Sequence, residues 1–275
     1  MTTETPVLAL RSLSVDYGIG HHRRRVVHGI DLEVRRGETV GLLGESGAGK
    51  STLGRAVVGL TPVADGRILV DGEDVTRPSR RERRQLARKV QMVFQDPYSS
   101  LNPAVPVGRL LAEPLLAAGV PAREARARSS DLLRRVGLPA SADQQYPGSF
   151  SGGQRQRIAI ARALVCGPGL VVCDEPVSAL DVSVQAQVLN LLRDLQQEYD
   201  IGYLFIGHDI DVVRFMSDRI AVLEGGELVE VGDAEQVTRR PGHACTRNLM
   251  AAAPSTDPEI RTERRRMRAL ARASR

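Results

Sequence analysis

Residues 44–51 constrain this chain more than any other segment, because they run Gly-Glu-Ser-Gly-Ala-Gly-Lys-Ser and fit the pattern G-x-x-x-x-G-K-[ST]. The apolar run Thr39–Leu43 comes directly before them, and a helical pattern begins at Lys50. A glycine-rich loop in this setting turns backbone N–H groups toward phosphate oxygens, and the helix N-terminus adds a favourable dipole. Lys50 would bring its charge to the β- and γ-phosphates, and Ser51 would offer a hydroxyl to Mg²⁺. The segment predicts a nucleoside-triphosphate site. A dinucleotide loop fits poorly, because the glycines do not follow G-x-G-x-x-G.

A pair of carboxylates marks a second strand end. Leu170–Cys173 is continuously apolar, and Asp174 and Glu175 follow it at once. Ligands of α/β sheets bind at the carboxyl ends of the strands. Asp174 could hold Mg²⁺ there, directly or through water, and Glu175 could polarise a water for attack on the γ-phosphate.

The order of apolar and helical segments predicts an α/β fold with a mostly parallel sheet. Runs near residues 40, 170, 204 and 220 are almost continuous in Val, Leu and Ile, as in strands buried on both faces. Helical patterns follow several of them. These patterns cover Lys50–Val58, Gln154–Leu164, Ser183–Tyr199 and Asp211–Phe215. Segments around 30–34 and 66–75 alternate apolar and polar residues instead, which favours an additional antiparallel layer.

Two regions depart from this alternation. Residues 97–150 hold seven prolines and helical runs at 108–118 and 122–136, which indicates a helical insertion. The chain becomes strongly basic after Pro258, and Glu259–Ala273 could form a helix. We therefore expect a catalytic domain over 1–240, with a helical subdomain at about 97–160, and a C-terminal extension with a basic tail over 241–275.

Composition and charge narrow the functional class. Residues 259–275 carry seven arginines and two glutamates, which accounts for the whole net charge of +5 of the 275-residue chain. The remaining body is neutral, so no nucleic-acid partner is expected. The longest uncharged apolar stretch, 163–173, is too short for a membrane span of about 20 residues. The N-terminus lacks a signal-peptide core, which predicts a cytoplasmic location. The three cysteines have no Cys-x-x-Cys spacing, so no cysteine metal site is expected.

A second anion-binding helix start lies 101 residues after Lys50. Phe150-Ser151-Gly152-Gly153-Gln154 opens a helix, with Ser151 as a natural N-cap and two glycines that allow close approach to an anion. One nucleotide rarely needs two such sites on one chain. The second site would therefore serve a partner chain.

Taken together, these motifs make the chain resemble ABC-type ATPases from about residue 7 to residue 258. Ser151–Gln154 resembles the signature motif of that family, and the motifs occur in the family's order. That order is the phosphate loop at 44–52, Gln95, the signature at 150–155, the acidic pair at 174–175, Ser178-Ala179-Leu180-Asp181 and His208. The resemblance implies an α/β fold: a P-loop NTPase (RecA-like) core with an antiparallel β subdomain and an inserted α-helical subdomain.

The resemblance also implies a role for each matching residue, with ATP and Mg²⁺ as cofactors. Glu175 would be the catalytic base, His208 would hold the base and the γ-phosphate in position, and Gln95 would contact Mg²⁺ or the attacking water. The implied metal contacts are Ser51, Gln95 and Asp174. The implied nucleotide contacts are Tyr17 (against adenine), Gly44, Ser46, Gly47, Gly49, Lys50, Ser51 and Thr52, with Ser151, Gly152, Gly153, Gln154 and Asp181 serving the nucleotide across a dimer.

A narrower resemblance concerns peptide and nickel importers. Residues 92–103, 150–164 and 174–187 are similar to the ATP-binding subunits of those systems. This implies an ATPase at the cytoplasmic face of the cell membrane, with integral membrane permease subunits and a second ATPase chain, the same or homologous, as partners. A substrate-binding protein outside the membrane would act with them indirectly. Two departures are Gly207 in place of the usual Ser or Thr before His208, and His243-Ala244-Cys245-Thr246 in place of His-Pro-Tyr-Thr.

Three other functions remain open. A soluble ABC-type ATPase acting on DNA is disfavoured, because such members carry a long coiled coil and the roughly 100 residues between the two phosphate-binding motifs contain many prolines and no heptads. One acting on ribosomes is disfavoured because such members usually carry two cassettes, and one set of motifs is present here. The ATPase half of an exporter is disfavoured only by the resemblance at 97–103. A degraded cassette that binds without hydrolysing is disfavoured because Lys50, Gln95, Glu175 and His208 are all present.

Overall fold

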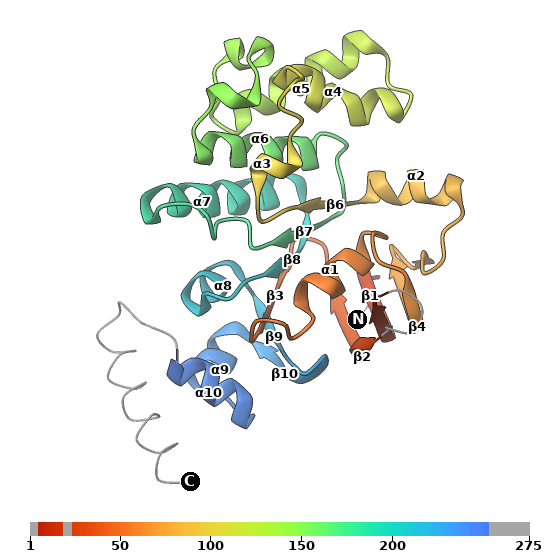
Figure 1. The fold of residues 1–275 in the computed structure, drawn as a ribbon, viewed down its shortest axis with the longest axis vertical. Helices are drawn as coiled ribbons and strands as arrows, with labels where there is room; N and C mark the ends of the chain where they lie inside the picture. The colour runs from red at the N-terminus through yellow and green to blue at the C-terminus, as the bar shows by residue number, and fades with distance from the viewer. Residues whose placement is uncertain (1–4, 19–23, 253–275) are drawn as a thin grey trace.

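The computed structural model describes residues 5–18 and 24–252, and a six-stranded sheet forms its centre (Figure 1). The strand order is β10-β9-β3-β8-β7-β6. All neighbouring pairs from β9 to β6 are parallel, and only β10 pairs antiparallel, with β9. These strands span Thr39–Gly44 (β3), Val90–Val93 (β6), Leu170–Asp174 (β7), Gly202–Ile206 (β8), Arg219–Glu224 (β9) and Glu227–Asp233 (β10). Since β3, β7 and β8 are buried along their whole length, the predicted parallel core is confirmed.

A second sheet, antiparallel throughout, packs beside the first in the order β2-β1-β4-β5. Its strands span Leu8–Tyr17 (β1), Arg24–Val34 (β2), Val63–Val70 (β4) and Glu73–Asp74 (β5). Helix α1 (Lys50–Val57) lies between this sheet and the central one, and its Leu53, Ala56 and Val57 join a hydrophobic core with residues of both. The antiparallel layer expected from the alternating segments is confirmed, and its first two strands are longer than predicted.

The helical insertion lies at the top of Figure 1, across the central sheet from the antiparallel sheet at the lower right. It contains α3 (Pro97–Ser100), α4 (Val107–Ala117), α5 (Ala122–Arg135), the 3₁₀ turns η2 (Ala140–Gln144) and η3 (Pro147–Ser149), and α6 (Gly152–Leu164). Its buried leucines share a second core with α7 (Val182–Tyr199) and the far face of the central sheet. Two hydrophobic cores thus flank the strands that present the predicted site.

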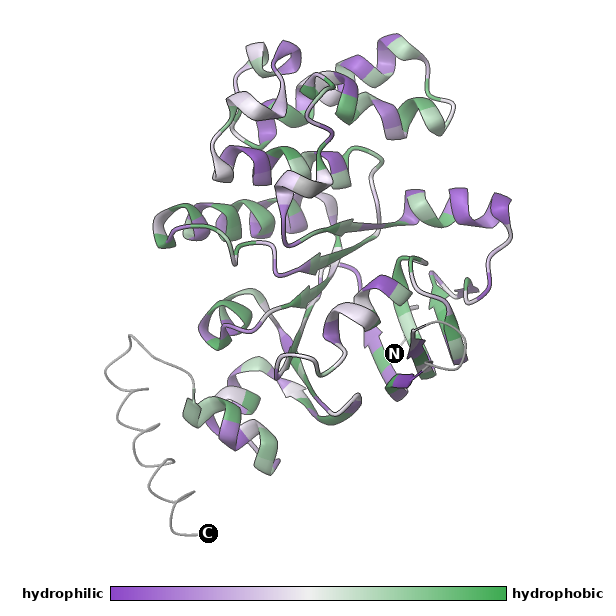
Figure 2. Ribbon diagram, in the orientation of Figure 1, coloured by the Kyte–Doolittle hydropathy of each residue, from purple (hydrophilic) through white to green (hydrophobic). Residues whose placement is uncertain are grey.

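Helix α2 (Arg80–Lys89) was not predicted as an element. Six of its ten residues are Arg or Lys, and Leu86 is the only one buried, so no apolar periodicity marks it in the sequence. A capping box between Ser79 and Glu82 starts the helix, and β6 follows it immediately. Figure 2 colours it almost entirely hydrophilic.

The last described elements are α8 (Ile210–Met216), α9 (Ala234–Arg239) and α10 (Ala244–Ala252). Glu230 of β10 accepts hydrogen bonds from the backbone N–H groups of Gly242 and His243, at 2.7 and 3.0 Å, and so ties the chain past residue 240 to the central sheet. The predicted basic tail lies outside the described residues. Within the described ranges, no helix combines the length and apolar character that a membrane span requires.

Candidate active site

The phosphate loop connects β3 to α1, as its motif predicts. Gly49 adopts φ +103°, and a Cβ there would lie 2.9 Å from the carbonyl oxygen of Val26, so glycine is required. Lys50 is buried, and its Nζ donates to the carbonyl oxygens of Gly44 and Glu45 at 2.8 and 2.9 Å. Burial lowers the pKa of Lys50. The lysine is therefore held by its own loop, in a place where a negatively charged ligand would favour its charged form.

Ser51 and Asp174 meet at the ends of two neighbouring elements. The Ser51 hydroxyl donates to Asp174 Oδ1 at 2.8 Å, although 123 positions separate the residues in sequence. Burial raises the pKa of Asp174, and the Ser51 hydrogen bond opposes that effect. A hydroxyl beside a buried carboxylate is an all-oxygen donor set, which fits the hard cation Mg²⁺.

Glu175 lies at the centre of a three-residue cluster. Its carboxylate Oε2 accepts a hydrogen bond from Gln95 Nε2 at 3.0 Å and lies 3.0 Å from His208 Nδ1. Gln95 follows β6, Glu175 follows β7 and His208 follows β8, three adjacent parallel strands. The structure thus brings the three predicted catalytic residues together.

The backbone at Glu175 is strained. Its φ is +49°, a left-handed conformation that costs a non-glycine residue on the order of 1–3 kcal/mol. Its N–H donates to the Ile206 carbonyl at 3.0 Å, which fixes the end of β7 against the end of β8. Strain of this kind concentrates at functional sites, where the surrounding structure enforces it. Here it aims one carboxylate at both Gln95 and His208.

The departure at Gly207 has a steric cause. A Cβ at Gly207 would lie 2.5 Å from Val213 Cγ2, so the valine of α8 occupies the space that a serine or threonine side chain would need. Gly207 is buried, and its neighbour His208 is exposed and bonded to Glu175. Val213 therefore packs against the segment that carries His208.

Replacing Gly207 with serine is expected to slow ATP turnover and to destabilise the fold by about 1–3 kcal/mol, because the new side chain overlaps Val213. The double variant Gly207→Ser, Val213→Ala should recover turnover, since alanine vacates the space. Phosphate release and thermal unfolding of both variants, with Val213→Ala as the control, check this. Normal ATP turnover in the Gly207→Ser single variant would contradict this expectation, because it would show that the Val213 side chain can move aside without cost to the site.

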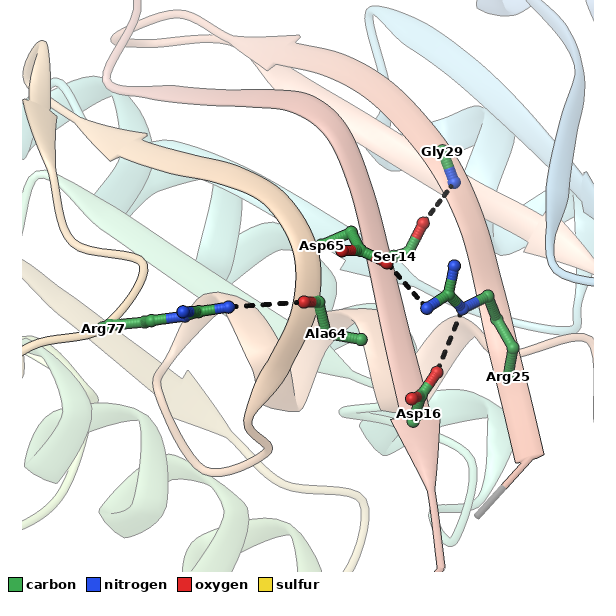
Figure 3. Close-up of polar contacts among 7 residues, drawn as sticks. All are labelled: Ser14, Asp16, Arg25, Gly29, Ala64, Asp65 and Arg77. Carbon is green, nitrogen blue, oxygen red and sulfur yellow. Dashed lines mark hydrogen bonds and ion pairs between the residues drawn. The ribbon is translucent and has the colours of Figure 1, made fainter.

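Tyr17 ends β1, and its side chain is 61% exposed. Next to it, Arg25 of β2 braces the strand end: it donates to Asp16 at 3.0 Å and to Asp65 of β4 at 2.7 Å (Figure 3). These contacts join three strands of the antiparallel sheet. The exposure of Tyr17 fits a ring that meets a flat ligand from the solvent side.

We expect Tyr17→Ala to weaken ATP binding more than Tyr17→Phe, because the phenylalanine ring keeps the stacking surface. Stacking of an aromatic side chain on a base contributes about 1–3 kcal/mol in single-strand binding, which sets the scale of the loss. Titration with a fluorescent ATP analogue measures the three affinities. Equal ATP affinities of the three proteins would show that Tyr17 only covers the end of the antiparallel sheet and does not stack on adenine.

The signature segment is built as a helix start. Ser151 Oγ accepts from the Gln154 N–H at 3.3 Å, and Gln154 Oε1 accepts from the Ser151 N–H at 2.9 Å, which makes a capping box at α6. Gly153 is tightly packed, since a Cβ there would lie 2.3 Å from Val184 Cγ1 of α7. Asp181 caps α7 and accepts from the Val184 N–H at 2.9 Å. The predicted cross-dimer residues therefore lie together, at the facing starts of α6 and α7.

The two phosphate-binding motifs remain separate within one chain. Among the described residues, no hydrogen bond joins Ser151–Gln154 to residues 44–52. Gly44, Ser46, Gly47 and Thr52 lie in the phosphate loop or the first turn of α1 as predicted.

Sequence reasoning missed Arg155 and Tyr98. The Arg155 guanidinium stacks 4.0 Å from the centroid of the Tyr98 ring and donates to the carbonyl oxygens of Pro147 and Gly148, at 2.7 and 3.1 Å. The position of Arg155 on a helix was visible from the motif. Its aromatic partner, 57 positions earlier, left no signal in the sequence.

This site defines a class of protein: a P-loop ATPase in which a helical insertion carries a second glycine-rich, capped helix start. Residues 27–178 match the family described as ABC transporter. The chain belongs to that family and is an ATP-binding, ATP-hydrolysing subunit of a transporter.

Relatives resemble the chain over most of its length. It is 46% identical to a Brucella ovis protein named for ATP binding in peptide import, over 97% of this chain and 84% of that one. It is also 46% identical to the oligopeptide transport ATP-binding protein OppF of Lactococcus lactis subsp. lactis, over 95% and 85% of the two chains.

Solved structures agree with the fold. CbiO1 of Clostridium perfringens, part of the ABC transporter complex cbiONQ, superposes with a TM-score of 0.77 at 30% identity, over 86% of this chain and 92% of that one. The ATP-binding cassette MJ0796, a dimer in a post-hydrolysis state with ADP and Pi, gives 0.74 at 28% identity, over 82% and 98%.

Proposed function

We propose that this subunit drives the import of peptides across a membrane, using ATP with Mg²⁺ and acting with a second cassette, membrane permeases and an external substrate-binding protein. The cluster of Gln95, Glu175 and His208 beside Ser51 and Asp174 carries the hydrolysis part of the proposal. The peptide part rests on the relatives named for peptide transport, which match almost the full chain. Nickel or a related small solute is the alternative cargo.

In this proposal each residue of the cluster has one task. Ser51 and Asp174, with Gln95, would hold Mg²⁺, which would neutralise charge on the phosphates. Glu175 accepts a proton from the attacking water, and His208, 3.0 Å from it, keeps the carboxylate oriented. Lys50 leaves the carbonyl oxygens of its own loop for the phosphate oxygens.

The separation of the two phosphate-binding motifs supports a shared site. Ser151 and Gly153 would meet the γ-phosphate bound by the facing chain, and Asp181 would lie at the same interface. Both helix starts are preorganised by their own caps, so little ordering is left for the moment of dimer closure.

A groove beside the site suits the permease. It has a volume of about 810 Å³ and runs between α2, β6, α4 and α6. Its lining combines apolar side chains, among them Met92, Phe94 and Pro114, with arginines of α2 and Arg162 of α6. Phe94 immediately precedes Gln95 in sequence, so a permease segment in this groove would lie next to the residue that contacts Glu175. Docking there would hold the chain at the cytoplasmic face of the membrane.

Reconstitution tests the cargo. The chain and its permeases are reconstituted in vesicles with the chain and ATP inside. The binding protein and labelled di- to pentapeptides or ⁶³Ni²⁺ are added outside. We expect peptide uptake that stops in the Glu175→Gln variant. ATP-dependent nickel uptake without peptide uptake would replace the peptide assignment and keep the ATPase assignment. ATP hydrolysis that ignores the permeases would favour an ATPase not coupled to transport.

A further inference from the structure

The segment that follows Gln95 is clamped against the signature helix by two arginines. Arg155 and Arg162 lie seven residues apart on α6, so they share one face of the helix. Arg155 stacks on Tyr98, and Arg162 donates to the carbonyl oxygen of Ser100. The four-residue helix α3 (Pro97–Ser100) is thereby held at both ends against one face of α6. We call the contacts of Arg155 with Tyr98 and of Arg162 with Ser100 the clamp.

Arg155 also fixes the approach to the signature. Its Nε and Nη2 donate to the carbonyl oxygens of Pro147 and Gly148, in the 3₁₀ turn that leads into Phe150 and Ser151. That turn is closed by hydrogen bonds from the Ser149 and Phe150 N–H groups to the Tyr146 and Pro147 carbonyls. One guanidinium thus joins the segment after Gln95 to the turn that sets the position of Ser151.

Tyr98 contributes little else to the fold. Its side chain is 62% exposed, and the large apolar residues of the helical insertion pack elsewhere, in the core shared with α7. Exposed tyrosines are ordinarily free to vary in position. The ring here lies face-on to a partly buried guanidinium at 4.0 Å, well inside the range of an effective cation–π contact of about 6 Å.

We propose that Arg155 is a positioning residue for ATP hydrolysis. Tyr98 holds the Arg155 guanidinium in place, so that the start of the signature helix moves together with the segment after Gln95. The proposal rests on the proposed function in one respect: the signature start must meet the nucleotide of a facing chain. Ser100 and Arg162 line the groove assigned to the permease, so a segment docked there would press on the same clamp. The clamp connects the groove, the Gln95–Glu175 contact and the signature.

Two substitutions of the exposed ring separate stacking from mere bulk. Tyr98→Phe keeps the aromatic face, whereas Tyr98→Leu keeps apolar volume and removes the cation–π contact. Amide hydrogen exchange of residues 147–153 in the nucleotide-free chain is the first readout. We expect exchange about two- to fivefold faster in Tyr98→Leu and unchanged exchange in Tyr98→Phe, as the size of an exposed cation–π contact predicts.

Tyr199→Leu is the matched control, because Tyr199 is also exposed and stacks on an arginine, Arg135, at 5.6 Å. It lies at the end of α7 and should not alter exchange at 147–153. Equal exchange in Tyr98→Phe and Tyr98→Leu would overturn the positioning role of Tyr98, and so would an equal change in Tyr199→Leu.

The second readout is the ATP concentration that gives half-maximal dimer in a Glu175→Gln background, by light scattering with candidate partner cassettes present. We expect Tyr98→Leu to raise this ATP concentration by about the same two- to fivefold factor, and Tyr98→Phe to leave it at the value found with tyrosine. The ATP affinity of the monomer should be the same in all three proteins. Faster exchange without any shift in dimer formation would overturn the link to the signature. Absence of ATP-dependent association with Tyr98 intact would instead count against the shared-site proposal, and the exchange result would still decide the role of the clamp.

Discussion

Replacing Glu175 with glutamine is expected to leave ATP binding intact and to slow hydrolysis by a factor of about 10² to 10⁴ or more. The amide keeps the shape of the side chain. It also keeps an oxygen that can accept a hydrogen bond from Gln95 Nε2, which lies 3.0 Å from Glu175 Oε2 in the unaltered chain. It has no carboxylate to take a proton from water. The contacts of Lys50 and of Ser51 with Asp174 do not involve this side chain and should persist.

The same variant should accumulate a closed dimer. Removing a negative charge near the γ-phosphate reduces repulsion there, and the helix start at Ser151 is unaffected. Light scattering with Mg-ATP, beside phosphate release, measures both effects, with Glu227→Gln on the exposed start of β10 as a matched control. Near-normal turnover would remove Glu175 from the mechanism. Lost turnover with no dimer under any partner condition would count against the shared site.

The candidate catalytic cluster was predictable in part from strand ends and in part from the family resemblance. Strand ends in a parallel sheet share one edge, which placed Asp174 and Glu175 at that edge. Gln95 and His208 were assigned from the family resemblance, and the strand order β8-β7-β6 that makes the three residues neighbours was not predicted. The hydrogen bond between Ser51, at the start of α1, and Asp174, at the end of β7, was not predicted, although both residues were assigned to Mg²⁺. Local patterns were sufficient for the acidic pair, since Asp174 and Glu175 directly follow their own apolar strand.

Features that depend on tertiary packing were not predictable in this way. Helix α2 carries a single buried side chain, Leu86, so no periodicity marks it, and only the capping box at Ser79 favours its start. The stack of Arg155 on Tyr98 joins two residues that are far apart in sequence, and no local pattern around either residue predicts the contact. The space taken by Val213 beside Gly207 depends on how α8 packs against β3 and β8. The division at residue 240 stays a prediction.

Lys50→Ala is expected to weaken ATP binding by roughly tenfold to a hundredfold or more, and to reduce turnover accordingly. The lysine supplies charge-assisted hydrogen bonds, each contributing about 1.5–3 kcal/mol. Without it the phosphates would face Asp174 and Glu175 with one positive charge fewer beside them. The carbonyl oxygens of Gly44 and Glu45 would also lose their donor, so the loop itself should loosen.

Ligand-linked unfolding separates lost binding from a damaged fold. ATP at a hundred times its Kd should raise the free energy of unfolding of the unaltered chain by about 2.7 kcal/mol. Lys50→Ala at the same ATP concentration should gain only about 1.4 kcal/mol after a tenfold loss of affinity and about 0.4 kcal/mol after a hundredfold loss. Its unfolding without ATP reports the cost of the loosened loop alone. Lys50→Arg serves as the control, because it keeps the charge on a larger, differently shaped group. If Lys50→Ala retained the full ATP-dependent gain and normal phosphate release, residues 44–51 would not be the nucleotide site, and the contacts of Ser51 and Asp174 would need another explanation.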